Sequence, residues 1–497
     1  MQPVSIGIDL GTSGVKIIAL TADGQTVASS SASYPLLTPQ PGWTEQHPSD
    51  WLIGTTTALK DLMLEIAHQF DVIAVGVSGQ MHGAVFLDSD RNVIRPAPLW
   101  NDQRTADACA ELDAAVPDLI ARTGNAAVTG FQLPKLLWLR QAEPQHYSRV
   151  AHLLFPKDYL NLCMTGIIAS EPSDASGSGA MNIHAQQWDD AIISALHLER
   201  SIFPTLHRSS SVIGRITPEF ATLCGLPAGI PVIAGAGDNA AAAIGLGVSS
   251  AKMGVGSVSL GTSGVLIAPL LEPKVQAQGR VHLFCHADGS YFLLGVTLSA
   301  AGSLQWLRDT IAPGVDFNDL MLEAAAIPSG CEGVTFMPYL SGERSPHLDP
   351  ELRGAWLGLS LAHGRGHLTR AVLEGVAFSL RDTLEVMRPL VTLESLLTVG
   401  GGATSALWLE IVGSALQTKL VKPALEEGPA RGAAILALVG AGVHSSVAAA
   451  LEATAPRLAP VTVTPDAALE RAYTRYQRGL AAAQVFNSRL EMRQLFA

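Results

Sequence analysis

The residues best suited to chemistry in this chain are acidic residues that stand beside glycine-rich turns. Asp9 ends a β-rich run just before the turn formed by residues 11–14, which read GTSG. A carboxylate at such a place is a costly half-buried charge unless it holds a cation. Mg²⁺ is the natural partner, because it takes one or two carboxylates and keeps most of its waters. A turn-capping role is the alternative interpretation of Asp9.

The turn after Asp9 occurs twice in the sequence. Residues 6–15 read IGIDLGTSGV and residues 256–265 read GSVSLGTSGV. Each turn offers backbone N–H groups and two hydroxyls with little side chain in the way, which suits phosphate oxygens. An ordinary hairpin turn would explain one copy, but two copies in the same setting favour phosphate binding by two similar halves. The candidate phosphate-binding residues are Gly11, Thr12, Ser13, Gly261, Thr262, Ser263 and Gly264.

A second acidic candidate lies where the two halves meet, in the segment IPVIAGAGDNAAAAIGLGV. A predicted strand over residues 231–234 leads into a turn of small residues, then Asp238 and Asn239, then an Ala/Gly-rich helix. Asp at a helix start often only caps the helix. The small neighbours would let a ligand approach closely, so Asp238 is also a candidate for catalysis.

Three further polar or glycine-rich clusters could bind ligands. Gly400, Gly401, Gly402 and Ala403 stand between a predicted strand (395–399) and a predicted helix (405–416). This arrangement lets a flat ring or a phosphate lie against the backbone, although a packing turn is the alternative. In the first half, the clusters that could hold a hydrophilic substrate are Met81-His82, Trp100-Asn101-Asp102 and Lys157-Asp158-Tyr159. His82 follows a strand, where open α/β sheets bind ligands.

The elements that must position these residues alternate between strands and helices. The apolar pattern predicts strands over 4–10 and 15–20 and a third strand after the turn at 22–24. It predicts a further strand over 71–78. It predicts a helix from Pro48 to about His68. The helix of small residues predicted over 428–442 suits close helix–helix contact, or plain core packing. The last 50 residues or so are predicted to be helical.

Composition sets the class of protein. The chain has 497 residues, of which 48% are hydrophobic and 15% charged, which excludes a disordered or fibrous protein. Its net charge of −12, with no basic block, argues against nucleic-acid and anionic-membrane partners. Five cysteines, far apart in the sequence, predict reduced thiols. The apolar runs do not have the features of a signal peptide or the length of a membrane span. We therefore expect a cytoplasmic protein.

Together these features resemble the FGGY family of carbohydrate kinases, within the actin and heat-shock-chaperone ATPase superfamily. The resemblance covers almost the whole chain. The family's C-terminal signature is matched at every position by residues 354–359 (GAWLGL), 367–368 (HL) and 371–374 (AVLE). The N-terminal signature is matched in part around residues 134–139 (PKLLWL), and Gln132 and Ala142 depart from it.

The resemblance implies an α/β fold with two similar actin-like (ribonuclease H-like) domains and a cleft between them. The expected divisions are a sugar-binding domain over residues 1–248, an ATP-binding domain over 249–445, and a helical extension over 446–497 that packs on the second domain. The segments at 78–83, 99–102, 156–160, 173–177 and 341–347 resemble the branch that phosphorylates D-xylulose at its 5-hydroxyl. A kinase for another ketose or polyol is the alternative.

The resemblance also implies roles for the candidate residues. Asp238 matches the catalytic base, Asp9 matches the metal-associated acid, and both are expected at the Mg²⁺ site. Met81 and His82 match the ketose-binding pair. The substrate-binding set is Met81, His82, Trp100, Asn101, Asp102, Asp238 and Asn239. Gly400 to Ala403 match the adenosine-binding turn of the ATP site. A homodimer is left open, and a nucleotide-dependent binding or chaperone module is the alternative from another class.

Overall fold

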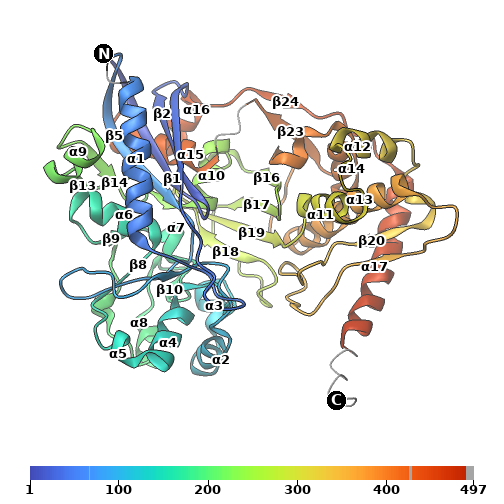
Figure 1. The fold of residues 1–497 in the computed structure, drawn as a ribbon, viewed down its shortest axis with the longest axis horizontal. Helices are drawn as coiled ribbons and strands as arrows, with labels where there is room; N and C mark the ends of the chain where they lie inside the picture. Colours follow the sequence, from blue (N-terminus) through green and yellow to red (C-terminus); the bar gives the residue numbers. More distant parts are fainter. Residues whose placement is uncertain (67, 425–427, 489–497) are drawn as a thin grey trace.

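The computed structural model describes residues 1–66, 68–424 and 428–488 of the chain. Two seven-stranded sheets lie side by side (Figure 1), each the centre of one lobe. The first sheet has the order β13-β14-β5-β1-β2-β3, with β15 paired to β5. Its strands are β1 (Gln2–Leu10), β2 (Gly14–Thr21), β3 (Thr26–Ser33), β5 (Phe70–Gly79), β13 (Val212–Arg215), β14 (Pro231–Ile233) and β15 (Ala236–Gly237).

The second sheet has the order β18-β19-β17-β16-β22-β23-β24. Its strands are β16 (Val255–Leu260), β17 (Gly264–Leu270), β18 (His282–Cys285), β19 (Tyr291–Thr297), β22 (Ser395–Val399), β23 (Lys419–Pro423) and β24 (Leu458–Pro460). In both sheets the strand before the repeated turn pairs antiparallel with the strand after it, and parallel with a later strand. This shared topology confirms the two similar α/β halves predicted from the repeat.

Helices cover both faces of each sheet. In the first lobe α1 (Pro48–Ile66), α6 (Pro156–Thr165) and α9 (Pro218–Cys224) pack against the outer face of the sheet. The predicted end of the first helix, near His68, adjoins residue 67, which lies outside the described residues. In the second lobe the covering helices are α11 (Ala301–Ile311), α12 (Phe317–Ala325), α13 (Arg365–Met387), α14 (Ala406–Leu416) and α17 (Ala467–Ser488).

Between the sheets lie α10 (Asp238–Leu246) and α15 (Gly428–Gly440), and α16 (Val447–Ala453) packs against α15. The contact between α10 and α15 is tight, because a Cβ on Gly432 would lie 1.8 Å from the carbonyl oxygen of Ala241. A Cβ on Gly7 of β1 would likewise meet the Ala430 oxygen at 1.9 Å. The predicted helix of small residues therefore forms the close helix–helix contact that its composition suggested, and it packs on the first sheet.

The segment between β5 and β13 forms most of the lower part of the first lobe in Figure 1. It contains α2 (Ala106–Ala115), α3 (Leu119–Thr123), α4 (Gln132–Ala142), α5 (Pro144–Tyr147), α7 (Pro172–Ala175) and α8 (Asp190–Ala195). Short strand pairs complete it: β4 (Glu45–Gln46) with β7 (Ala97–Pro98), β6 (Val85–Leu87) with β8 (His152–Leu154), β9 (Ala169–Ser170) with β12 (Thr205–Leu206), and β10 (Met181–Asn182) with β11 (Gln187–Trp188). In the second lobe β20 (Thr335–Met337) pairs with β21 (Ala355–Leu357).

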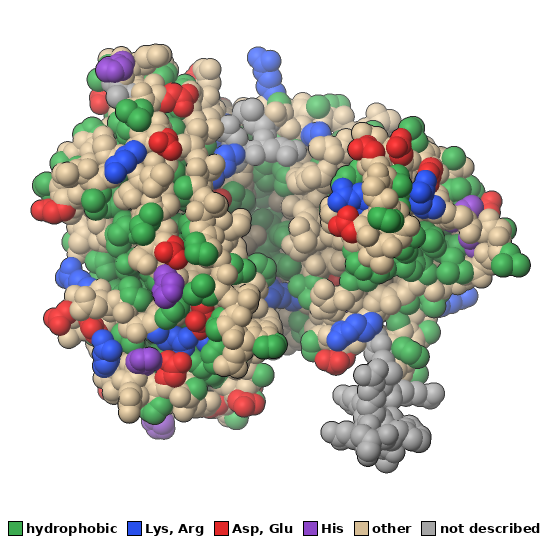
Figure 2. Space-filling view, viewed as in Figure 1, with side chains coloured by type: hydrophobic (Ala, Val, Ile, Leu, Met, Phe, Trp, Pro, Cys, Tyr) green, Lys and Arg blue, Asp and Glu red, His purple; other side chains and the backbone are tan. Residues whose placement is uncertain are grey.

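Figure 2 shows a hollow between the two lobes, which agrees with the predicted cleft. Within the described parts of the chain, no helix has both the length and the hydropathy that a membrane span requires. The predicted domain boundaries at 248, 249 and 445 stay predictions.

Candidate active site

The two acidic candidates lie at one edge of the first sheet. β1 and β5 run parallel with Asp9 opposite Ser78, and β15 runs parallel to β5 with Ala236 opposite the same Ser78. Asp238 follows β15 directly. Because the carboxyl ends of parallel strands meet at one edge of a sheet, both carboxylates are brought to the same place. The charge of Asp9 raises the pKa of Asp238, so the two carboxylates interact at this edge.

Burial raises the pKa values of both acids, and the charge of Asp9 raises the pKa of Asp238 further. The pKa of Asp9 rises from 3.8 to about 6, chiefly through burial, although Ser78 Oγ donates to Oδ1 at 3.4 Å. The pKa of Asp238 rises from 3.8 to about 7 through burial and then through the charge of Asp9. No described residue forms an ion pair with either carboxylate. Two neighbouring carboxylates without a counter-ion fit a divalent cation.

Asp238 is not the helix cap that its position in the sequence allowed. Gly237 is the N-cap, and Asp238 is the first residue of α10. Its Oδ1 accepts hydrogen bonds from the backbone N–H (2.7 Å) and side-chain amide (2.8 Å) of Asn239. Met81 packs beside this turn, since a Cβ on Gly237 would lie 2.8 Å from Met81 Cγ. The structure therefore brings three predicted site residues, Asp238, Asn239 and Met81, together.

His82 is held in one orientation by its surroundings. Its backbone is in the left-handed region with φ of 69°, and its ring stacks on Phe131 with centroids 4.6 Å apart. Nδ1 lies 2.8 Å from the carbonyl oxygen of Gly177, so Nδ1 carries the proton and donates it. Burial lowers the pKa of the ring well below 6.5. The neutral ring therefore presents Nε2 as an acceptor, which suits a substrate hydroxyl.

The buried Lys135 ties the His82 loop to the next loop. Its Nζ donates to the carbonyl oxygens of His82 (2.7 Å) and Gly130 (2.6 Å), and its side chain is fully buried. Burial lowers its pKa from 10.5 to about 7. Sequence reasoning noted Lys135 only within a family signature and missed this role. A buried donor between two loop carbonyls cannot be recognised from its neighbours in sequence.

The first repeated turn is docked onto the predicted substrate loops. Trp100 Nε1 donates to Thr12 Oγ1 at 2.9 Å, and Thr12 Oγ1 donates to Gln80 Oε1 at 3.2 Å. The Thr12 hydroxyl is thus occupied within the protein. The backbone N–H groups of Thr12 and Ser13 have no hydrogen-bond partner among the described residues. These amides, rather than the hydroxyl of Thr12, are available to an anion.

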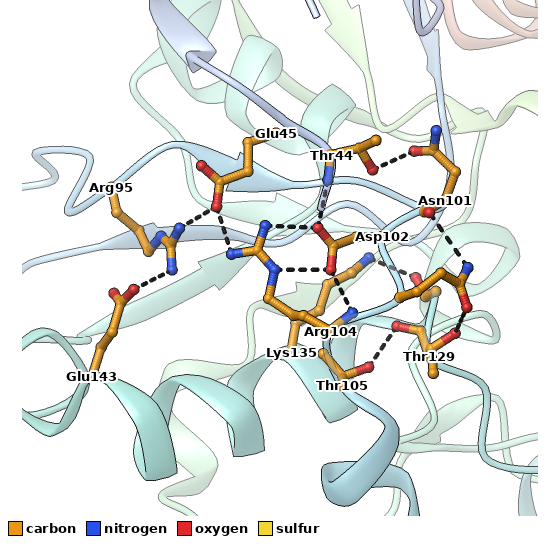
Figure 3. Close-up of polar contacts among 12 residues, drawn as sticks. Thr44, Glu45, Arg95, Asn101, Asp102, Arg104, Thr105, Thr129, Lys135 and Glu143 are labelled. Atoms are coloured by element: carbon orange, nitrogen blue, oxygen red, sulfur yellow. Dashed lines mark hydrogen bonds and ion pairs between the residues drawn. The ribbon is translucent and has the colours of Figure 1, made fainter. Parts of the chain in front are cut away.

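Asp102 is part of a buried ion-pair network (Figure 3), so its carboxylate is already saturated with donors. Arg104 donates to it from Nε (2.8 Å), Nη2 (2.7 Å) and the backbone (3.0 Å), and the Thr44 N–H donates at 2.7 Å. Arg104 also pairs with Glu45 at 2.6 Å and stacks 3.6 Å over the ring of Trp43. Asp102 thereby fixes the loop that carries Trp100 and Asn101, and its predicted sugar contact stays a prediction.

The second repeated turn lies at the corresponding edge of the second sheet. β16 and β22 are parallel, with Ser259 opposite Val399, so the turns that follow them are neighbours. Gly400 has φ of 89°, and a Cβ there would lie 3.0 Å from the Gly261 nitrogen. The N–H groups of Thr262 and Ser263 have no described hydrogen-bond partner. Gly264 belongs to β17. A Cβ on this residue would lie only 2.4 Å from Thr297 Oγ1, so the position has no room for a larger side chain.

A pocket of about 820 Å³ adjoins this turn and is mostly apolar. Gly401 and Gly402 form one wall. The other walls come from α11, α12 and the start of α14 and include Leu304, Phe317, Met321 and Trp408. A flat apolar ring system fits such a pocket. The sequence indicated the glycine wall but not the helical walls, since amphipathic helices give no sign of which cavity they line.

Arg344 is a further cleft residue that sequence reasoning did not single out. It is half-buried in the 341–347 loop of the second lobe and makes no side-chain hydrogen bond or ion pair with a described residue. Its positive charge helps lower the pKa values of His82 and His282, after burial. A cation of the second lobe thus acts electrostatically on a predicted sugar ligand of the first.

Comparisons with known proteins agree with this arrangement. Models of the FGGY family of carbohydrate kinases match residues 4–245 (N-terminal domain) and 256–441 (C-terminal domain). The chain is 40% identical to a xylulose kinase of Bacillus subtilis over 89% of both chains. It is 41% identical to a xylulose kinase of Escherichia coli over 89% of this chain and 91% of that one.

A solved structure is similar over nearly the whole molecule. The crystal structure of a xyloylose kinase from Brucella ovis matches with a TM-score of 0.91 at 37% identity, covering 97% of this chain and all of that one. With that coverage the match extends across both lobes.

Proposed function

Because the chain belongs to the FGGY family of carbohydrate kinases, we propose that it transfers the terminal phosphoryl group of ATP to the 5-hydroxyl of D-xylulose. The proposal is supported by the similarity to xylulose kinases over most of the chain. The observation that carries the chemistry is the pair of acids at the first sheet's edge, where the pKa of Asp238 is raised to about 7. A general base works best with a pKa near the working pH.

In this mechanism Asp238 accepts the proton of the attacking hydroxyl. Asn239 holds Asp238 Oδ1 through two hydrogen bonds, and no described residue donates a hydrogen bond to Asp238 Oδ2. The base is therefore oriented before the substrate arrives. Phosphoryl transfer otherwise requires mainly positioning and charge neutralisation.

Asp9 and Asp238 would hold the divalent cation, which we propose to be Mg²⁺. The ion would neutralise charge on the β- and γ-phosphates. The N–H groups of the two repeated turns, at Thr12 and Ser13 and at Thr262 and Ser263, would donate hydrogen bonds to phosphate oxygens. The pocket beside Gly401 and Gly402 would take the adenine ring.

The sugar would bind in the first lobe. Neutral His82 offers Nε2 to a sugar hydroxyl, while Met81, Trp100, Asn101 and Asn239 line the neighbouring turns. Closure of the lobes would bring Arg344 toward the transferred group and exclude water, which would otherwise compete as acceptor. We propose that the protein acts in the cytoplasm.

A panel of ketoses and polyols in a coupled assay of ADP release tests the proposal. D-Xylulose should give the highest kcat/KM, with little ATP turnover when no sugar is present. A higher kcat/KM for another ketose or for a polyol would assign the chain to a different branch of the family. ATP turnover that does not depend on any sugar would favour the binding or chaperone module.

A further inference from the structure

A second pocket lies away from the cleft residues, where the two lobes are joined. It has a volume of about 600 Å³ and is fairly enclosed. One wall comes from the first lobe (208–210), one from the connection after α10 (249–251), one from the hairpin between β18 and β19 (286–289), and one from the end of α15 and the start of α16. None of the residues assigned to the sugar or to ATP lines it. Its size fits a small metabolite.

The walls of this pocket are rich in hydrogen-bond donors that have no partner. Arg208 forms no ion pair and no side-chain hydrogen bond with any described residue. Ser210 and Ser445 make no side-chain hydrogen bond either, across the described ranges. The hydroxyl oxygens of Ser249 and Ser446 accept helix N–H groups, which leaves their protons free to donate. A guanidinium and four hydroxyl protons of lining residues are therefore available to a ligand, and Arg208, Ser445 and Ser446 are exposed.

Asp288, the acid in the pocket lining, does not accept hydrogen bonds from these donors. Asp288 accepts from the N–H and hydroxyl of Ser250 (2.9 and 2.8 Å) and from the N–H and hydroxyl of Ser290. Four donors therefore already satisfy its two oxygens.

His286 contributes a buried side chain to the pocket lining. Its residue is 2% exposed, and its Nε2 lies 3.1 Å from the Val248 carbonyl oxygen, so Nε2 carries the proton. Its buried Nδ1 makes no hydrogen bond with a described residue and lies 3.7 Å from Asp288 Oδ1.

We propose that this pocket binds a small phosphate-bearing molecule, most simply a sugar phosphate. Phosphate oxygens would satisfy the guanidinium and serine donors, which a neutral sugar would leave short of acceptors. Because the walls come from both lobes and from the connection between them, an occupied pocket would favour one relative position of the lobes. The proposal goes beyond the phosphorylation of xylulose and does not depend on it.

Calorimetric titration of the full-length protein tests the proposal. The cleft is first saturated with ADP, Mg²⁺ and D-xylulose, and inorganic phosphate, D-glucose 6-phosphate or D-glucose is then added. We expect D-glucose 6-phosphate to bind and D-glucose not to bind. Binding of inorganic phosphate alone would reduce the site to a phosphate-ion site and overturn the sugar-phosphate assignment.

Three variants locate the binding. Arg208→Gln should weaken it about tenfold or more, the usual effect of losing a charge-assisted hydrogen bond. Ser445→Trp, at an exposed position on the rim, should abolish it by filling the space. Arg200→Gln, an exposed arginine of the same lobe outside the lining, should leave it unchanged.

Two outcomes would overturn the pocket itself. One is no binding of either phosphate compound to the wild-type protein. The other is wild-type affinity in both Arg208→Gln and Ser445→Trp with melting temperatures unchanged, which would place the bound phosphate elsewhere. Slower hydrogen exchange at 208–210 and 445–448 on binding is the independent readout, and it requires no kinase activity.

Discussion

Replacing Asp238 by asparagine should make the protein more stable and nearly inactive at the same time. The variant keeps the size of the side chain and an acceptor for the Asn239 amide, but it removes the proton acceptor. Loss of a general base typically lowers the rate by about 10²–10⁴. We therefore expect kcat with D-xylulose to fall by roughly that factor, while the KM for sugar changes much less.

The stability effect follows from the raised pKa. An unfolded Asp loses its proton near pH 3.8, whereas folded Asp238 loses it near 7. Between these values the folded state binds more protons, so the free energy of unfolding decreases as the pH rises and the loss is complete above about pH 7. Its upper limit is about 4 kcal/mol at pH 8 and less than half of that at pH 5. The neutral amide of the Asp238→Asn variant carries no such cost, so the variant should melt at a higher temperature than the wild type, and more so at pH 8.

The assay combines kcat from coupled ADP release with thermal melts at pH 5 and pH 8 in the absence of divalent cation. Asp102→Asn is the matched control, because it breaks a buried pair with Arg104 and should lower stability by about 3–5 kcal/mol. If Asp238→Asn retains more than about a tenth of wild-type kcat, Asp238 is not the base. If it melts below the wild type at both pH values, the electrostatic cost derived from Asp9 and Asp238 is wrong.

Three further substitutions test the remaining parts of the site. His82→Ala should raise the KM for D-xylulose and leave the KM for ATP about unchanged in steady-state kinetics; an equal rise in both would assign the loop to closure. Gly401→Val should weaken ATP binding in calorimetry without lowering the melting temperature, because a Cβ there meets no atom within 4 Å, and unchanged affinity would remove this turn from the nucleotide site. Lys135→Met should raise the sugar KM several-fold by freeing the His82 and Gly130 carbonyls, and a fall in melting temperature with normal sugar KM would leave Lys135 a purely structural residue.

The sequence was sufficient wherever a local pattern decides the structure. The repeated GTSG turn follows strands that form equivalent pairs in the two sheets, and the predicted strands over 4–10, 15–20 and 71–78 lie within the observed β1, β2 and β5. Asp9 and Asp238 could be predicted as candidates because Asp9 lies near the end of a strand and Asp238 follows one, and strand ends share an edge. Their proximity depends on the order of strands in the sheet, which no local pattern contains.

The sequence was insufficient wherever partners come from distant segments. Asp102 looked like a free polar group, but its carboxylate accepts from the distant Thr44 N–H and from Arg104, which also pairs with the distant Glu45. Gly264 looked like part of a phosphate turn, yet its small size accommodates Thr297 of the neighbouring strand β19. The wall of the adenine pocket formed by α12 is likewise set by packing between helices, and nothing in residues 317–325 alone indicates it.

Because of the position of α15, the first lobe is completed by a segment from late in the chain. This helix follows the strands of the second sheet in sequence, yet its Ala430 and Ala433 carbonyls lie against Gly7 and Gly76 in the first. A fragment that ends near residue 248 would lack this helix and expose a glycine-lined, apolar sheet face to water. Such a fragment should aggregate when expressed alone and become soluble when residues 249–488 are supplied as a separate chain. We therefore expect that the two halves do not fold as autonomous modules, and that exchange of halves between related kinases succeeds only if α15 is transferred together with the first sheet.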